Sequence, residues 1–171
     1  MRSMSSKNNT KMTRTDAREQ TFILIFEKSF RDEPMSEIIE LAENARMLTP
    51  NDYIRGVAVG TFDNIEMIDK QISNNLQGWK LERVSKVSLA LLRLCIYEMF
   101  FEKDIPLKVS INEAVELCKK YAMPEDAAYI NGVLGSISRS EENAKAFDAS
   151  ANLTAPEKEI IFEAEDDFDV Q

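Results

Sequence analysis

The residues near the start of the chain that are best suited to chemistry are cations. Lys7, Lys11, Arg14 and Arg18 lie in or beside a polar segment rich in Ser, Asn, Thr and Lys. A flexible cationic arm that leads into a helix N-terminus suits contacts with phosphates, because the side chains and the free backbone N–H groups both attract anions. An ordinary solvated arm is the alternative interpretation of the same residues.

The residue types that most enzymes need are missing or isolated. The chain has no histidine and only two cysteines, Cys95 and Cys118. Two cysteines do not make a structural zinc site, which takes four ligands, and both lie in apolar stretches typical of small buried side chains. We find no glycine-rich phosphate loop and no nucleophile elbow. We therefore expect no catalytic residue, no metal and no cofactor, and a protein that is not an enzyme.

Negative charge is concentrated at the C-terminal end. The formal net charge is −9, of which −8 falls in residues 140–171 and −1 in residues 1–139. A nearly neutral body binds nucleic acid only where its cations cluster. The acids of the C-terminal segment are Glu141, Glu142, Asp148, Glu157, Glu159, Glu163, Glu165, Asp166, Asp167 and Asp169.

The elements that must position these side chains are helices. Low glycine and proline contents disfavour a sheet with many tight turns. A first helix is expected from Asp16, whose spacing from Glu19 is that of a capping box, to about Phe30. A second is expected over 36–47, where apolar residues recur with a helical period.

The clearest period predicts a long third helix over 50–76, about 40 Å in length. Thr49 has the residue type of an N-cap, and Pro50 suits the first helical position. Gly56 and Gly60 cost helix stability, which a close helix crossing at both glycines would explain. Gly78 and Trp79, just beyond this helix, indicate a loop.

Three more helices follow in the sequence. One is expected over 84–102, where Arg93 interrupts the apolar pattern and should form an internal ion pair, for instance with Glu98 or Glu113. Another should begin at Ile111, after a capping box formed by Ser110 and Glu113. The last is expected over 125–139.

These patterns predict an all-α protein of about six or seven helices. We expect a flexible basic arm over 1–13, a helical domain over 14–139 and a flexible acidic tail over 140–171. The N-terminus lacks an apolar signal segment, and no apolar run reaches the ~18 residues of a membrane helix. A cytoplasmic protein with no membrane contact is expected.

One segment carries a specific resemblance to a known family. Residues 106–134 resemble the signature of the NusB family, and shorter matches occur in the same order upstream, so that the resemblance covers about residues 14–139. The residues that carry it are Ala17-Arg18-Glu19, Arg55-Gly56-Val57, Leu92-Arg93-Leu94, Tyr97-Glu98, Pro106, Lys108-Val109, Ile111 to Leu117, Lys119-Lys120, Glu125-Asp126 and Asn131 to Leu134.

The resemblance implies a compact domain of two helical bundles and a role in transcription antitermination. Members of this family bind the boxA element of ribosomal RNA leader transcripts. They do so together with NusE, a small-subunit ribosomal protein, and the pair joins the antitermination complex of RNA polymerase. We therefore expect boxA-type single-stranded RNA, NusE and that complex as partners.

The resemblance also implies site residues. The family's arginine-rich stretch at the start of the first helix corresponds here to Arg14 and Arg18, with Lys7 and Lys11 on the arm. Four phosphate contacts with single-stranded RNA would give a slope of about −2.8 when the logarithm of the binding constant is plotted against the logarithm of the salt concentration. Lys108 would extend the basic surface. The residues expected to bind the protein partner are Phe22, Phe26, Asp126 and Ile130.

Other functions remain open at this stage. The family's arginine stretch is thinner here, since Thr15 and Asp16 stand at positions where arginines are frequent. A helical scaffold that binds a ribosomal protein and has weak or no boxA binding is therefore an alternative. A homodimer that covers its RNA face is a third possibility. The acidic tail either competes with RNA for the basic patch or serves as a solubilising extension.

Overall fold

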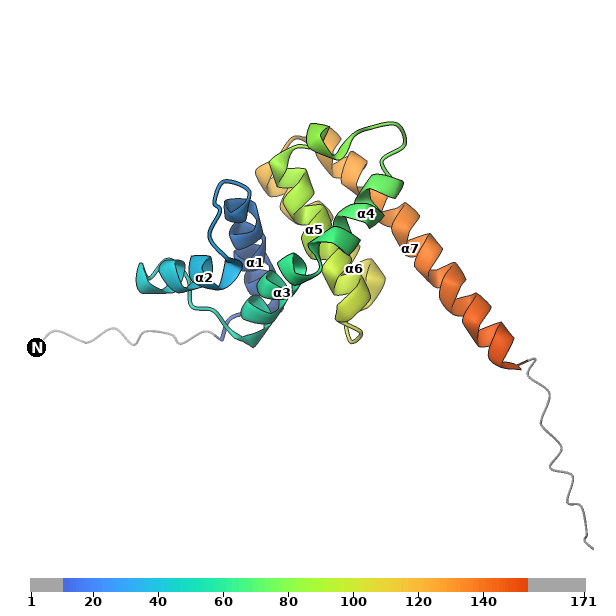
Figure 1. The fold of residues 1–171 in the computed structure, drawn as a ribbon, viewed down its shortest axis with the longest axis horizontal. Helices are drawn as coiled ribbons and strands as arrows, with labels where there is room; N and C mark the ends of the chain where they lie inside the picture. The colour runs from blue at the N-terminus through green and yellow to red at the C-terminus, as the bar shows by residue number, and fades with distance from the viewer. Residues whose placement is uncertain (1–10, 154–171) are drawn as a thin grey trace, which may run out of the picture. The chain divides into compact units, whose positions relative to one another are not determined.

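The computed structural model describes residues 11–153, with side-chain environments as far as Glu141. Over this range the chain forms seven α-helices and one short 3-10 helix, with no strand, which confirms the all-α prediction (Figure 1). Lys7 and the end of the acidic tail lie outside the described residues. The helices are α1 (Arg14–Lys28), α2 (Met35–Asn44), α3 (Asp52–Asp63), α4 (Ile65–Asn74), η1 (Leu81–Arg83), α5 (Lys86–Phe101), α6 (Leu107–Tyr121) and α7 (Pro124–Leu153).

The first helix begins earlier than its sequence pattern indicated. Its N-cap is Thr13, whose hydroxyl accepts a hydrogen bond from the backbone N–H of Asp16 at 3.1 Å. The Asp16 carboxylate in turn accepts one from the N–H of Thr13 at 3.2 Å, which completes a capping box. The predicted cap at Asp16 was therefore wrong, because Thr13 is the N-cap residue of the box and Asp16 is its N3 residue.

The predicted single helix over 50–76 is two helices. Asn51, not Thr49, is the N-cap, and its side-chain oxygen accepts from the N–H of Ile54 at 2.9 Å. The break falls at Asn64, whose side chain donates to the carbonyl of Gly60 at 2.8 Å. Asparagine side chains compete with the helix for backbone groups, so the segment changes direction here although its apolar period continues.

Two bundles share one core. Helices α1, α2 and α3 pack on one another, and α5 packs on α4 and α6 while also contacting α1 and α3. Buried residues cover most of the circumference of α5, including Leu91, Leu92, Leu94 and Ile96, and the remaining face is partly buried. Each such side chain contributes roughly 1.5–3 kcal/mol when removed from water. Helix α5 is therefore the central element that joins the bundles (Figure 1).

The two helix-interior glycines behave differently. A Cβ added at Gly60 would overlap the ring of Tyr97 on α5, whereas one at Gly56 would meet nothing within 4 Å. The predicted close crossing is confirmed at Gly60 and wrong at Gly56.

The last two helices also differ from their predicted bounds. Helix α6 begins at Leu107, so Ser110 lies inside the helix as a buried residue and is not its cap. Helix α7 continues to Leu153, beyond the predicted end near Arg139. The chain divides by its contacts into two units, 1–139 and 140–171, the second of which is described only as far as Leu153.

Cys95 and Cys118 are buried free thiols, as expected. Within residues 11–153, no helix is long and apolar enough to cross a membrane.

Candidate nucleic-acid interface

Arg14 presents its guanidinium at the start of α1. The residue is exposed, and its guanidinium carbon lies 4.1 Å from the centroid of the Tyr53 ring on α3. Lys11, just before the helix, is exposed too. Both are placed where an anion could reach them, beside the unpaired N–H groups of a helix N-terminus.

Arg18, one turn further along α1, points into the protein. It is only 3% exposed. Its Nε donates to Oε1 of Glu98 at 2.8 Å, and its Nη1 lies 3.2 Å from Oε2 of Glu113. Burial alone would lower the pKa of this guanidinium, but the hydrogen bond and charge of Glu98 outweigh it and the pKa is raised. The prediction that Arg18 contacts RNA is therefore wrong in this structure, because its donors are committed to two carboxylates.

Tyr53 joins Arg14 to this buried ion pair. Its hydroxyl donates to Oε1 of Glu98, the same oxygen that accepts from Arg18. Burial, together with the nearby charge of Glu98, raises the pKa of the Tyr53 hydroxyl, which therefore stays protonated. The buried carboxylate of Glu98 on α5 thus accepts hydrogen bonds from Arg18 of α1 and Tyr53 of α3.

Arg93 forms its predicted internal ion pair, but with a different acid. Its Nε and Nη2 donate to the two carboxylate oxygens of Asp69 on α4, both at 2.8 Å. The expected partners Glu98 and Glu113 belong to Arg18 instead. This bidentate geometry is the strong form of an arginine–carboxylate contact, and it connects α4 to α5.

The end of α6 contacts the first helix. Glu19 accepts hydrogen bonds from Nζ of Lys120 at 2.5 Å and from the hydroxyl of Tyr121. These two hydrogen bonds hold the pKa of the Glu19 carboxyl below its usual value. The ring of Tyr121 also lies 5.1 Å from that of Phe22, centroid to centroid.

The start of α7 follows directly. The carboxylate of Asp126 accepts from the N–H of Met123, two residues after Tyr121, at 3.2 Å. The start of α1 and the Asp126 end of α7 are therefore linked through the end of α6. Lys108 lies 12 residues before Lys120 on α6, roughly 18 Å away along the helix, so it does not join this region.

The aromatic residues of α1 are partly core and partly surface. Phe22 is only 2% exposed, and Ile130 on α7 is fully buried. Both were predicted to bind a partner, and both predictions are wrong because the side chains pack in the core. Phe26 is half-buried and meets Phe30 edge to face at 5.2 Å. Phe30, which the sequence interpretation did not single out, is 62% exposed.

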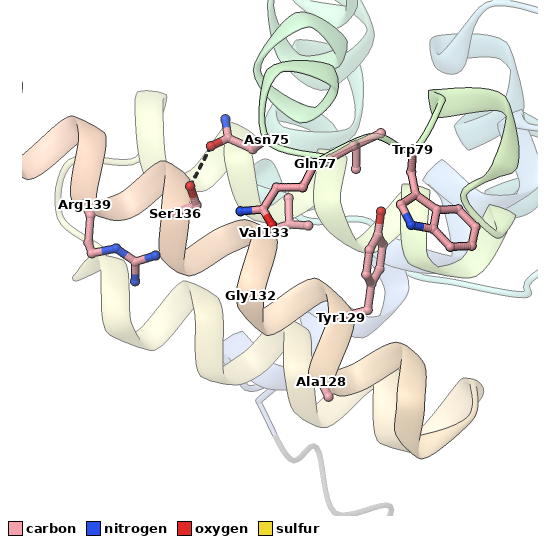
Figure 2. A pocket seen from close by; sticks show the side chains of 10 residues that line it. Asn75, Gln77, Trp79, Ala128, Tyr129, Gly132, Val133, Ser136 and Arg139 are labelled. Carbon is pink, nitrogen blue, oxygen red and sulfur yellow. Dashed lines mark hydrogen bonds between the residues drawn. The ribbon is translucent and has the colours of Figure 1, made fainter.

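A second aromatic group surrounds an open hollow of about 480 Å³ between the loop after α4 and α7 (Figure 2). Trp79 is 57% exposed, and its ring lies 6.4 Å from that of Tyr129. Figure 2 shows these rings side by side at one end of the hollow and Arg139 at the other. Its lining residues are Asn75, Leu76, Gln77, Trp79, Ala128, Tyr129, Gly132, Val133, Ser136 and Arg139.

Further cations line two neighbouring hollows. Trp79 also lines a neighbouring hollow with Lys80 and Arg83. A third, of about 140 Å³, is lined by Trp79, Arg83, Tyr129 and Asp126 among others. The Tyr129 hydroxyl is buried and has no hydrogen-bond partner among the described residues. The sequence interpretation treated Trp79 only as a loop marker, although an indole followed at once by Lys80 was a signal that could have been used.

Lys86, at the start of α5, completes this region. Its Nζ lies 5.3 Å from the centroid of the Phe30 ring, and Ser85, its neighbour in the chain, lines the hollow that contains Asp126. The group around Phe30 and the group around Trp79 are therefore adjacent in the chain at Ser85 and Lys86. We call the two groups together the aromatic–basic surface, made of Phe26, Phe30, Lys86, Trp79, Lys80, Arg83, Tyr129 and Arg139.

Over the part of the chain that the structure describes, no group of three or more acidic, cysteine or histidine side chains could hold a metal ion. The chemistry that the surface offers is stacking and the binding of anions.

The amino-acid sequence matches one protein family. The model of the NusB family matches residues 15–139. A transcription antitermination protein NusB from Clostridium botulinum (strain Kyoto / Type A2) is 41% identical over 142 residues, covering 74% of this chain and 99% of that protein. Its counterpart from Clostridium novyi is 44% identical over 130 residues, covering 74% and 98%.

Solved structures of the same family have a similar fold. T. maritima NusB superposes with a TM-score of 0.66 and 34% identity, covering 75% of this chain and 92% of the other. A chain from a crystal structure of the antitermination factors NusB and NusE in complex with dsRNA gives a TM-score of 0.67 and 26% identity, covering 74% and 96%. The fold and the sequence therefore point to the same relatives.

Proposed function

Because the chain belongs to the NusB family of transcription antitermination proteins, we propose that it binds the boxA element of ribosomal RNA leader transcripts together with NusE. The pair would act within the antitermination complex of RNA polymerase and promote transcription of ribosomal RNA. The observation that carries the proposal is the aromatic–basic surface, which combines exposed rings with cations beside the start of α7.

The chemistry of this surface suits single-stranded RNA. Unpaired bases stack on aromatic side chains, at roughly 1–3 kcal/mol per base, while cations hold the phosphates. Trp79 and Tyr129 supply rings, and Lys80, Arg83 and Arg139 supply the charges. Lys11 and Arg14 add cations at the start of α1, although Arg18 does not.

A protein partner would dock on the adjoining aromatic residues. The half-buried Phe26 and the exposed Phe30 form an edge-to-face pair at the end of α1, with Lys86 beside Phe30. Aromatic side chains of this kind are typical anchors of protein interfaces. The predicted contact through Asp126 fits, since this residue is only partly buried and borders the hollow next to Trp79. We therefore propose Phe26, Phe30 and Asp126 as the NusE-binding residues.

A gel-shift experiment tests the proposal. Labelled boxA RNA and a scrambled RNA of the same composition are mixed with this protein, with NusE, or with both. We expect cooperative binding of boxA RNA when both proteins are present and little binding of the scrambled RNA. Equal binding of the two RNAs by the mixture would contradict the proposed boxA specificity.

A pair of variants tests the site itself. Trp79→Ala should weaken RNA binding about tenfold, the effect of losing one stacked base. Met47→Ala, which also removes a highly exposed apolar side chain, is the matched control and should bind RNA as the wild type does. If both variants bind alike, RNA does not stack on Trp79.

A scaffold that binds only the ribosomal protein is the second candidate. One observation favours it: Arg18 is buried and Lys120 is paired with Glu19, which removes two cations from the RNA face. The same gel shift decides, since a scaffold binds NusE without preferring either RNA. Sedimentation at several protein concentrations tests the remaining possibility, a homodimer that covers this face.

A further inference from the structure

The guanidinium of Arg14 is held in place although the residue is exposed. It lies over the ring of Tyr53, with 4.1 Å between the guanidinium carbon and the ring centroid. The segment just before α1 is close to α3 as well, since the side-chain amide of Asn51 contacts the sulfur of Met12 at 3.8 Å. The contact therefore favours one direction of the side chain over the others open to a free surface arginine.

Tyr53 is itself held by a hydrogen bond to a buried side chain. Its ring is partly buried, and its hydroxyl donates to Oε1 of Glu98, whose side chain is fully buried. The same carboxylate is anchored by Nε of Arg18 at 2.8 Å. The ring that supports Arg14 is thus attached to the buried ion pair that joins α1 to α5.

We propose that Tyr53 is a positioning residue for RNA binding: it presents the guanidinium of Arg14, edge outwards, to a phosphate group at the N-terminus of α1. The guanidinium carbon lies over the ring, 4.1 Å from its centroid. A guanidinium whose face rests on a ring keeps its N–H edge for a bidentate contact with phosphate oxygens. A side chain ordered before binding loses less conformational freedom on binding. The inference rests on the proposed function, since it assigns a role to a residue beneath the RNA-binding arm.

Two substitutions at position 53 separate the ring from its hydroxyl. Tyr53→Leu removes the ring, and Tyr53→Phe keeps it but removes the hydrogen bond to Glu98. We expect Tyr53→Leu to weaken boxA binding about two- to fivefold, the size of an exposed cation–π contact, and Tyr53→Phe to weaken it less. Arg14→Ala should also reduce the salt slope by about 0.7.

A double-mutant cycle shows whether Tyr53 acts through Arg14. In the Arg14→Ala background, Tyr53→Leu should cost little further affinity, because the side chain that it positions is already gone. A purely structural role would instead give the same loss in both backgrounds. Additive losses, or an unchanged affinity of Tyr53→Leu while Arg14→Ala weakens binding, would overturn the inference. No boxA binding by the wild type with NusE would overturn the proposed function instead.

A measurement on the wild type does not depend on any variant folding. Protons of the Arg14 side chain over the Tyr53 ring should show an upfield ring-current shift in the NMR spectrum. On titration with boxA RNA, the Nε–H signal of Arg14 should move while the ring-current shift remains. Loss of that shift on binding would show that Arg14 leaves Tyr53 to reach the RNA, which contradicts positioning by the ring.

Discussion

At the scale of single residues, two arginines one turn apart on α1 have opposite environments. Arg14 is exposed at the start of the helix, whereas Arg18 is buried between Glu98 and Glu113. A buried guanidinium needs carboxylate partners to offset the loss of water. Arg18 therefore holds α1 against α5 and α6, and only Arg14 is free to serve RNA binding.

The first prediction concerns the partner of Arg18. Glu98→Ala leaves a buried guanidinium with only Glu113 and also removes the acceptor of the Tyr53 hydroxyl. We expect the free energy of unfolding to fall by about 3 kcal/mol or more, measured by urea denaturation. Arg55→Ala is the control, since it breaks an ion pair whose side chains are nearly half exposed and should cost about 0.5 kcal/mol or less. Equal losses would mean that burial does not set the strength of these pairs.

The second prediction follows from the lowered pKa of Glu19, caused by hydrogen bonds from Lys120 and Tyr121. A carboxyl whose pKa is lower in the folded state stabilises the fold above its unfolded pKa, near 4.5, and loses that contribution as the pH falls through the folded value. Glu19→Gln should therefore be less stable than the wild type at pH 7, with the difference shrinking below about pH 4.5.

Thermal unfolding between pH 3 and pH 7 measures this difference. Glu40→Gln, on the exposed face of α2, is the matched control and should keep a constant offset from the wild type. A constant offset for Glu19→Gln as well would show that the contact between α1 and α6 contributes nothing through its charge.

Residue environments were the least predictable part of the site. The local sequence Ala17-Arg18-Glu19 does not reveal whether the arginine is exposed or buried. That depends on Glu98, the partner of Arg18, which is 80 residues away in the chain. The same holds for Arg93, whose partner Asp69 lies on another helix. Phe26, Asp126 and Arg14 could be placed at the surface from the family resemblance, whereas the exposure of Phe30 and Trp79 depends on how the bundles meet.

At the scale of elements, the third prediction uses the two glycines of α3. Gly56→Ala adds a methyl group into open space and should stabilise the protein by about 0.5–1 kcal/mol, the usual helix gain. Gly60→Ala must displace the ring of Tyr97, which stacks on Phe101 at 4.8 Å, and should cost about 1–2 kcal/mol.

Urea denaturation of both variants gives the comparison, with each serving as the control for the other. The same sign of change at both positions would mean that the crossing between α3 and α5 adapts at no cost. The opposite signs that we expect would confirm that Gly60, and not Gly56, sets the approach of these helices.

Helix existence was predictable, but helix ends were not. Apolar residues recur through residues 54–76 without interruption, so the period alone could not reveal the break at Asn64. At the break, the carbonyl of Gly60 accepts hydrogen bonds from both the backbone N–H and the side-chain amide of Asn64. Likewise, Ser110 and Glu113 have the spacing of a cap yet lie inside α6, because the helix already begins at Leu107 with Pro106 as its N-cap residue.

At the scale of the whole molecule, the fourth prediction concerns charge. Replacing the acids at 157, 159, 163, 165, 166, 167 and 169 with amides removes seven negative charges. The association rate constant with RNA should rise up to about tenfold at low ionic strength, and the effect should shrink above about 0.1 M salt. Stopped-flow binding measures it.

A shuffled version of residues 154–171 is the control for that experiment. Shuffling keeps the composition and the net charge, so RNA association should match the wild type if long-range repulsion is the cause. An unchanged rate after amide replacement would leave only a solubilising role for the acids.

The single core shared by both bundles has a consequence for how the protein denatures. Its buried cluster includes residues of α1 to α7 without a boundary between the groups, so neither bundle has an apolar interior of its own to keep once the other is lost. Heating should therefore give one cooperative transition, with equal calorimetric and van't Hoff enthalpies. The proposed ribonucleic-acid and protein-docking faces would disappear at the same temperature, and a chaperone or protease would encounter either the complete fold or none of it.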